Sequence, residues 1–205
     1  MLNLIWSKPL ISKPGSELRY SYANYILLGL IIEHITKKKY SDFIQKELFD
    51  KVSMPNTGFG KAESEVTGYY ITEEEKLIPA YSSNEFKKVT SAADAFSNAD
   101  DLHKYMRSMF DGKLLSKKSL QKMLTTHNRK KNGQAFGFNK HKFFLFSMYY
   151  NASRFEGYSS FILYFPFFDL TMILLSNTYA DMDFCITLLK ALKGMKSKIP
   201  KSKTK

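Results

Sequence analysis

The chain has 205 residues, of which 44% are hydrophobic and 15% aromatic, so it can bury one sizeable core and is not disordered throughout. Its single cysteine, Cys185, excludes an intramolecular disulfide and a cysteine-based metal cluster. A formal net charge of +12 at pH 7 favours anionic partners over cationic ones.

The amino terminus does not have the features of an export signal. Residues 1–6 read MLNLIW and lack the basic flank, the long apolar stretch and the small-residue cleavage site of a signal peptide. We therefore expect no signal peptide in this chain. Its localisation stays open, because a longer parent protein could belong to the cell envelope or be secreted.

Two helices are predicted near the amino terminus. Apolar residues between Ile26 and Ile35 cover nearly every face of the first, which is typical of a buried helix. It is expected to end at Thr36, where the lysines of residues 37–39 suit the negative end of the helix dipole. Ser41 is expected to cap the second helix. The inward residues of that helix are Phe43, Ile44, Leu48 and Phe49.

The middle of the chain combines loops and helices. Residues 52–95 show weak periodicity and are predicted to form loops and short strands. Ser97 or Asn98 opens a helix that breaks at residues 111–112, and Ser116 caps the next.

The carboxy-terminal part changes to strands. Residues 143–150, 158–165 and 170–176 are short, aromatic-rich apolar runs that predict three antiparallel strands. Pro166 interrupts the apolar stretch around it, so no transmembrane segment is predicted. A last helix is expected over residues 181–192. The sequence thus predicts an α+β fold, an antiparallel sheet flanked by helices with a helical lobe, in one domain over residues 1–195.

Positive charge is concentrated at the carboxy-terminal end. Residues 1–126 hold 18 basic and 15 acidic side chains, a balance of +3, whereas residues 127–205 hold 13 and 4, a balance of +9. Seven lysines and no acid lie from Lys190 to Lys205. Residues 196–205 are predicted to be a disordered basic tail, and the segment from Lys190 to Lys205 suits an anionic surface. No aromatic residue is interleaved there, so nucleic acid is not expected as a partner.

Seven fragments in order along the chain carry a resemblance to a known family. The first, residues 14–29, reads PGSELRYSYANYILLG. It resembles the pattern Pro-Gly-x-x-Phe-x-Tyr-Ser-Asn-x-x-Tyr-x-Leu-Leu-Gly of the serine β-lactamase and penicillin-binding-protein-like family, in particular its class C β-lactamase-related members. The other fragments are residues 48–59, 97–102, 111–116, 136–138, 157–160 and 174–177. The resemblance covers roughly residues 10–190 and implies a β-lactamase/transpeptidase-like fold.

The resemblance assigns a catalytic tyrosine to this chain. Anchored on Pro14 and Gly29, the proton-relaying tyrosine of the family is Tyr20, and the asparagine that contacts lysine and substrate is replaced by Tyr22. A second alignment, displaced by two residues, would read residues 22–24 as the Tyr-Ala-Asn of class C β-lactamases.

A substrate-binding strand edge is implied as well. The family's Lys-or-His-Thr-Gly motif falls on Asn151, Ala152 and Ser153, counting back from Gly157. The cation, the hydroxyl and the glycine of the motif are all replaced. We expect weak anion recognition there, with Ser153 still able to donate a hydrogen bond.

The family's nucleophile is not found at its expected place. Its Ser-x-x-Lys motif lies several tens of residues before the turn at Pro14, where this chain has thirteen. Residues 119–122 and 202–205 spell the motif but follow neither the family's order nor its setting, so both are interpreted as coincidence. The histidines show no metal-ligand spacing, and neither metal nor cofactor is expected.

We therefore expect a truncated, degenerate member of this family that does not hydrolyse β-lactams, D-alanyl peptides or esters by itself. An alternative is a non-catalytic module that binds a peptidoglycan-type peptide or an anionic polymer. A third is an enzyme whose other half comes from a second polypeptide. Because the family's amino-terminal strands and nucleophile-bearing helix are not expected in this chain, a sheet edge and an apolar cleft face that they normally cover should be exposed.

Overall fold

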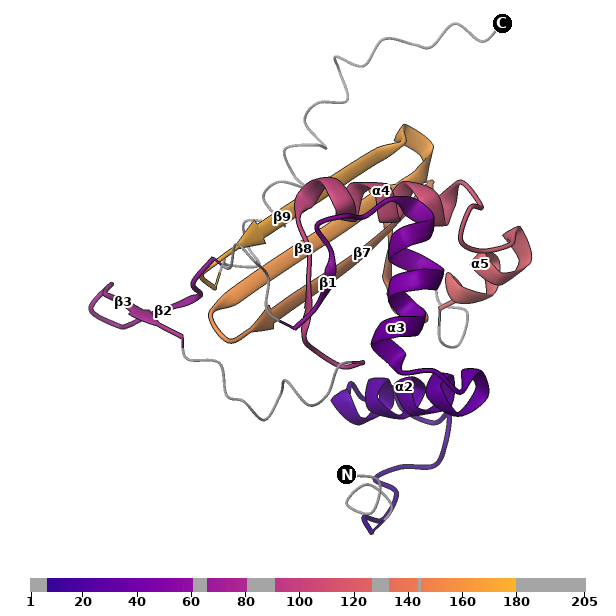
Figure 1. Ribbon diagram of the computed structural model, residues 1–205, viewed down its shortest axis with the longest axis horizontal. Helices are drawn as coiled ribbons and strands as arrows, with labels where there is room; N and C mark the ends of the chain where they lie inside the picture. The colour runs from indigo at the N-terminus through magenta and orange to yellow at the C-terminus, as the bar shows by residue number, and fades with distance from the viewer. Residues whose placement is uncertain (1–6, 61–65, 81–90, 127–132, 144, 180–205) are drawn as a thin grey trace, which may run out of the picture.

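The computed structural model describes residues 7–60, 66–80, 91–126, 133–143 and 145–179, and it shows helices against one face of an antiparallel sheet (Figure 1). This arrangement confirms the predicted α+β class. The predicted last helix and the basic tail lie outside the described residues, so the domain limit at residue 195 stays a prediction.

The sheet has five described strands in the order β5-β6-β7-β8-β9, each antiparallel to its neighbours. The strands are β5 (Gly133–Gln134), β6 (Asn139–Phe143), β7 (Phe146–Phe155), β8 (Tyr158–Phe165) and β9 (Leu170–Ser176). The last two match their predicted ranges. The predicted run over residues 143–150 is interrupted, because β6 ends at Phe143, which pairs with Phe146 across a tight turn.

Strand alternation gives this sheet two apolar faces. On one face Tyr149 and Tyr164 pack with Met106 and Met109 of α4 (Ala99–Phe110). Met148 and Leu163 belong to the cluster on the opposite face. Helix α5 (Lys117–Met123) adds partly buried side chains to the first cluster. The main core therefore lies between α4 and the sheet.

Helix α2 (Tyr22–Thr36) is not the buried helix that its composition predicts. Of its residues only Gly29 is buried, whereas Leu28, Ile31 and Ile35 are 55%, 52% and 72% exposed. Their spacing places them on one side of the helix. One side of α2 is therefore an exposed apolar face. The expected sheet edge is present too, because β9 pairs only with β8 among the described strands.

Helix α3 (Tyr40–Ile44) continues into a π-helix, η1 (Gln45–Phe49), and a 3-10 turn, η2 (Asp50–Val52). Lys39, and not the predicted Ser41, is its N-cap residue. The helix starts earlier because the Tyr40 amide donates to Glu33 Oε1 of α2 at 2.8 Å. The predicted caps Asn98 and Ser116 are confirmed at α4 and α5.

Short strands occupy the predicted loop region. Strand β1 (Gly58–Phe59) pairs with β4 (Ala95–Phe96), and β2 (Tyr69–Ile71) pairs with β3 (Leu77–Pro79). The segment before β2 is fixed to the sheet, since the Tyr158 hydroxyl donates to the Val66 carbonyl at 2.6 Å. Within the described residues, no helix is both long and apolar enough to cross a membrane.

Gly29 gives the first testable prediction. A Cβ atom at this position would lie 2.3 Å from both Cβ and Oγ of Ser91. Gly29→Ala should therefore lower the free energy of unfolding by about 1–3 kcal/mol, although alanine favours a helix more than glycine does. Urea unfolding followed by circular dichroism measures this change.

The matched control adds Ser91→Gly to Gly29→Ala, which removes the clashing side chain. The double variant should recover most of the lost stability. Equal stability of Gly29→Ala and the wild type would contradict this packing.

Candidate active site

Tyr20 lies directly before the first turn of α2. Ser21 has extended backbone and caps the helix, its side chain accepting a hydrogen bond from the Ala23 amide at 3.2 Å. The cap fixes where the chain enters the helix, and it leaves the Tyr20 side chain 64% exposed.

Two further tyrosines surround Tyr20. Its ring lies 5.6 Å from that of Tyr22, edge to face, and 6.0 Å from that of Tyr25. The structure therefore brings the predicted Tyr20 and Tyr22 together. Tyr25 was not singled out from the sequence, although its place one helical turn after Tyr22 was the available signal.

These surroundings favour a neutral Tyr20 phenol. Partial burial, and then the neighbouring Tyr22 and Tyr25, raise the pKa of Tyr20 above its ordinary value. The nearest cation in sequence, Arg19, is paired with Glu17 at 2.8 Å. A proton relay needs a pKa shift in the opposite direction.

The predicted strand edge lies at the end of β7. The pairing of β6 with β7 stops at Asn139 and Tyr150, so residues 151–155 of β7 pair only with β8 among the described strands. Asn151 and Ser153 are both exposed and lie on one face of the strand. The side-chain amide of Asn151 donates a hydrogen bond to the Gly137 carbonyl at 3.0 Å. The sequence did not indicate this partner.

The structure does not join the two predicted parts of the site. Figure 1 shows α2 below α3, apart from the strands β7 and β8. In the described part of the chain, the ring contacts of Tyr20 are those with Tyr22 and Tyr25. The same part holds no group of three or more histidine, cysteine or acidic side chains that could bind a metal.

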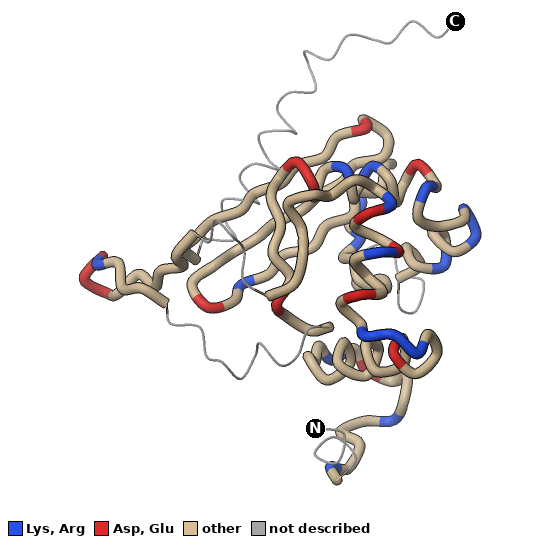
Figure 2. Tube along the Cα trace, viewed as in Figure 1, with Lys and Arg blue, Asp and Glu red and all other residues tan. Residues whose placement is uncertain are grey.

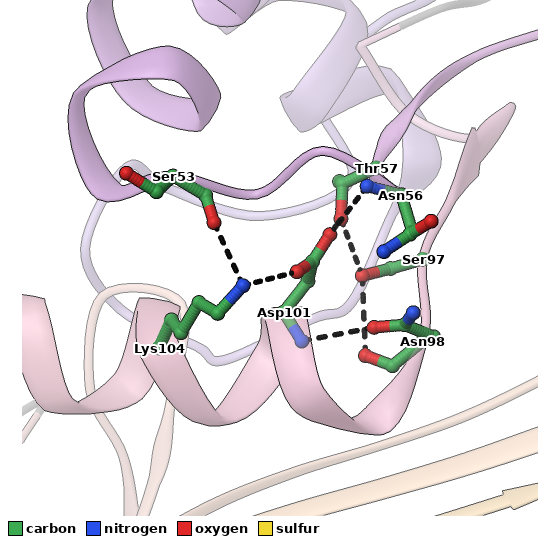
Figure 3. A network of polar contacts seen from close by, with 7 residues as sticks. All are labelled: Ser53, Asn56, Thr57, Ser97, Asn98, Asp101 and Lys104. Atoms are coloured by element: carbon green, nitrogen blue, oxygen red, sulfur yellow. Dashed lines mark hydrogen bonds and ion pairs between the residues drawn. The ribbon is translucent and has the colours of Figure 1, made fainter.

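Two of the family-like fragments meet in a buried polar network (Figure 3). Asp101 of α4 is fully buried and accepts hydrogen bonds from the Asn56 amide at 2.7 Å and the Thr57 hydroxyl at 3.0 Å. Lys104 donates to Asp101 at 3.0 Å and to the Ser53 carbonyl at 2.9 Å. The network therefore ties residues 53–57 to α4.

The same hydrogen bonds keep Asp101 charged. Burial disfavours its carboxylate, but the bonds from Lys104, Asn56 and Thr57 outweigh this effect and lower the pKa of Asp101. The described contacts of Asp101 are thus all with groups of the protein itself. The fragments at residues 54–57 and 97–101 thus serve the fold.

Asp101→Ala should lower the free energy of unfolding by about 2–4 kcal/mol at pH 7, because the Asn56 and Thr57 donors lose a buried acceptor. The Lys104 pair contributes less, since its side chain is 42% exposed. Urea unfolding measures the change, with Asp100→Ala, an exposed neighbour in the same helical turn, as the control.

The pH dependence follows from the lowered pKa. The contribution of Asp101 should be complete above the unfolded-state pKa of about 4 and should decrease as the pH falls through the lower folded-state pKa. The difference between wild type and Asp101→Ala should therefore shrink in acid. A difference that stays constant down to acidic pH would contradict a buried carboxylate.

Comparisons with known proteins agree with the family-like fragments. The Beta-lactamase family model matches residues 1–192. The penicillin-binding protein PbpX of Bacillus subtilis strain 168 is 31% identical over 121 residues, which are 57% of this chain and 30% of that protein. Protein flp of Staphylococcus aureus strain N315 is 28% identical over 181 residues, which are 82% of this chain and 35% of that protein.

Solved structures share the fold. A penicillin-binding protein from Bacillus halodurans has a TM-score of 0.76 at 18% identity, over 91% of this chain and 60% of its own. The octameric penicillin-binding protein homologue from Pyrococcus abyssi has a TM-score of 0.77 at 24% identity, over 90% of this chain and 44% of its own. A D-stereospecific amidohydrolase from a Streptomyces species has a TM-score of 0.71 at 20% identity, over 82% of this chain and 52% of its own. The chain spans about a third of the length of the curated relatives that it matches.

Proposed function

Because this chain belongs to the β-lactamase family, we propose that it supplies the tyrosine-bearing helix and the carboxy-terminal sheet of a serine hydrolase fold and does not hydrolyse substrates by itself. The substrates of a complete fold would be β-lactams, D-alanyl peptides or small esters. The similarity to an amidohydrolase specific for the D configuration supports amides of that kind.

The setting of Tyr20 is the observation that carries this proposal. A relay tyrosine acts on the proton of a nucleophile and works best with a lowered pKa. Here burial and two tyrosines raise the pKa of Tyr20, and Tyr22 occupies the place of an amide side chain. A phenol cannot offer both an amide donor and a carbonyl acceptor.

The described Ser-x-x-Lys match does not supply the nucleophile. Ser119 lies in α5, whose Leu120 and Met123 pack against the main core. The Ser116 hydroxyl, which caps that helix, donates to the Ser119 hydroxyl at 3.0 Å. Ser119 is therefore part of a helix start and has no contact with Tyr20 among its described hydrogen bonds.

A fluorescent penicillin tests for an active serine. The purified chain should carry no covalent label after incubation, because Ser119 of the described Ser-x-x-Lys match hydrogen-bonds the Ser116 hydroxyl, which is not a general base. Intact-protein mass spectrometry measures the adduct, and Ser119→Ala is the matched control. A stoichiometric mass increase that Ser119→Ala removes would identify a working nucleophile and would contradict inactivity.

A second candidate function is a non-catalytic module that binds a peptidoglycan-type peptide or an anionic polymer. Residues 151–153 of β7 support it, because among the described strands they pair with β8 alone and an extended peptide can add to a strand edge. The balance of +9 over residues 127–205 supports attraction of a polyanion.

Deletion of residues 190–205 tests the polymer arm of this candidate. The full chain should bind polyglycerol phosphate in a salt-sensitive way, and the deletion should weaken binding by about tenfold or more because seven lysines are lost. Isothermal titration calorimetry at low and high salt measures this. Affinity that changes with neither salt nor the deletion would contradict an electrostatic role of these lysines.

A further inference from the structure

Two neighbouring turns form a protruding apolar cluster at one end of the sheet. The start of β7, with Leu145 before it, lies beside the 3-10 turn η5 (Pro166–Phe168), because the first part of β7 pairs with the end of β8. The ring of Phe146 stacks on that of Phe167 at 3.5 Å. Phe168 lies edge to face against Phe167 at 5.0 Å. We name Leu145, Phe146, Phe167 and Phe168 the aromatic tip.

The aromatic tip is open to solvent. Leu145 is 85% exposed, Phe167 61% and Phe168 37%. Exposed turns are usually built from polar residues, glycine and proline. In η5 the turn geometry is provided by Pro166 and by Asp169, which has a φ of 49°. The two phenylalanines between them are not needed to form the turn.

Charged side chains of both signs lie beside the tip. Asp169 accepts a hydrogen bond from the Tyr164 hydroxyl at 2.9 Å and pairs with Arg107 of α4, which also lies 3.8 Å from Asp111. Lys140 and Lys142 lie on β6, the strand that leads into the tip. Figure 2 shows both basic and acidic segments around this end of the sheet. An anionic surface is therefore favoured over a cationic one.

We propose that the aromatic tip inserts into the interfacial region of an anionic lipid membrane. Aromatic and leucine side chains suit that region, and nearby cations add attraction to anionic headgroups. A second copy of the chain fits less well, because a stable protein interface buries about 800 Å² on each partner and four side chains on a convex end supply far less.

Vesicle binding of the full chain tests the proposal. Phosphatidylcholine vesicles with phosphatidylglycerol should bind the wild type, and vesicles of phosphatidylcholine alone should bind it more weakly. Leu145→Ser with Phe167→Ser should weaken the partition into anionic vesicles by about tenfold or more, because two inserted apolar side chains are lost. Co-sedimentation measures the partition.

The matched control is Phe136→Ser with Leu77→Ser, the same residue types at 66% and 57% exposure away from the tip. This variant should bind as the wild type does, and circular dichroism checks that both variants are folded. Insertion is measured with a variant that carries Leu145→Trp together with Trp6→Phe, so that its one tryptophan lies in the tip. Brominated phosphatidylcholine in anionic vesicles should quench the fluorescence of this tryptophan.

Three results would overturn the proposal. One is equal binding by the wild type and the tip variant, which would point to the lysines from Lys190 to Lys205 as the contact. Another is a bound Leu145→Trp variant without quenching. The third is self-association in lipid-free sedimentation that the tip variant abolishes, which would make a second copy of the chain the occupant.

Discussion

The buried carboxylate of Asp101 is the constraint on which the rest of the structure depends. It joins two segments that lie more than forty residues apart in the sequence. Its partners Asn56 and Thr57 follow the amino-terminal helical lobe, from α2 to η2, whereas Asp101 itself belongs to α4. Helix α4 in turn packs on the sheet through Met106 and Met109. A buried charge persists only where such bonds satisfy it. This network therefore connects the lobe that carries Tyr20 with the sheet that carries Asn151.

In the described part of the chain, helix α2, which follows Tyr20, packs against the rest of the protein on one side only. Helix α2 is held from one side, where Gly29 allows Ser91 to approach and Glu33 receives the Tyr40 amide. The opposite side exposes Leu28 and Ile31 to solvent. Exposed apolar faces of this kind usually have a partner. The chain belongs to the β-lactamase family and spans about a third of the length of the curated relatives that it matches.

Local patterns predicted most of the elements. Alternating apolar runs identified β8 and β9, and the caps Asn98 and Ser116 depend only on neighbouring amides. Errors arose where distant residues decide the outcome. The exposure of α2 depends on what packs against it, and the start of α3 depends on Glu33 seven residues earlier. For the same reason the motif could suggest Tyr20 as a candidate but could not predict its pKa, which burial and the rings of Tyr22 and Tyr25 raise.

The protonation of Tyr20 tests the central claim most directly, because a relay tyrosine needs a lowered pKa. Tyrosine labelled with carbon-13 at Cζ, with Tyr20→Phe to assign the signal, would report its titration by nuclear magnetic resonance. Our account predicts a pKa above the ordinary value of about 10, as expected for a chain without an activated phenol. A pKa below about 8 would show that the chain alone activates Tyr20 and would contradict the account.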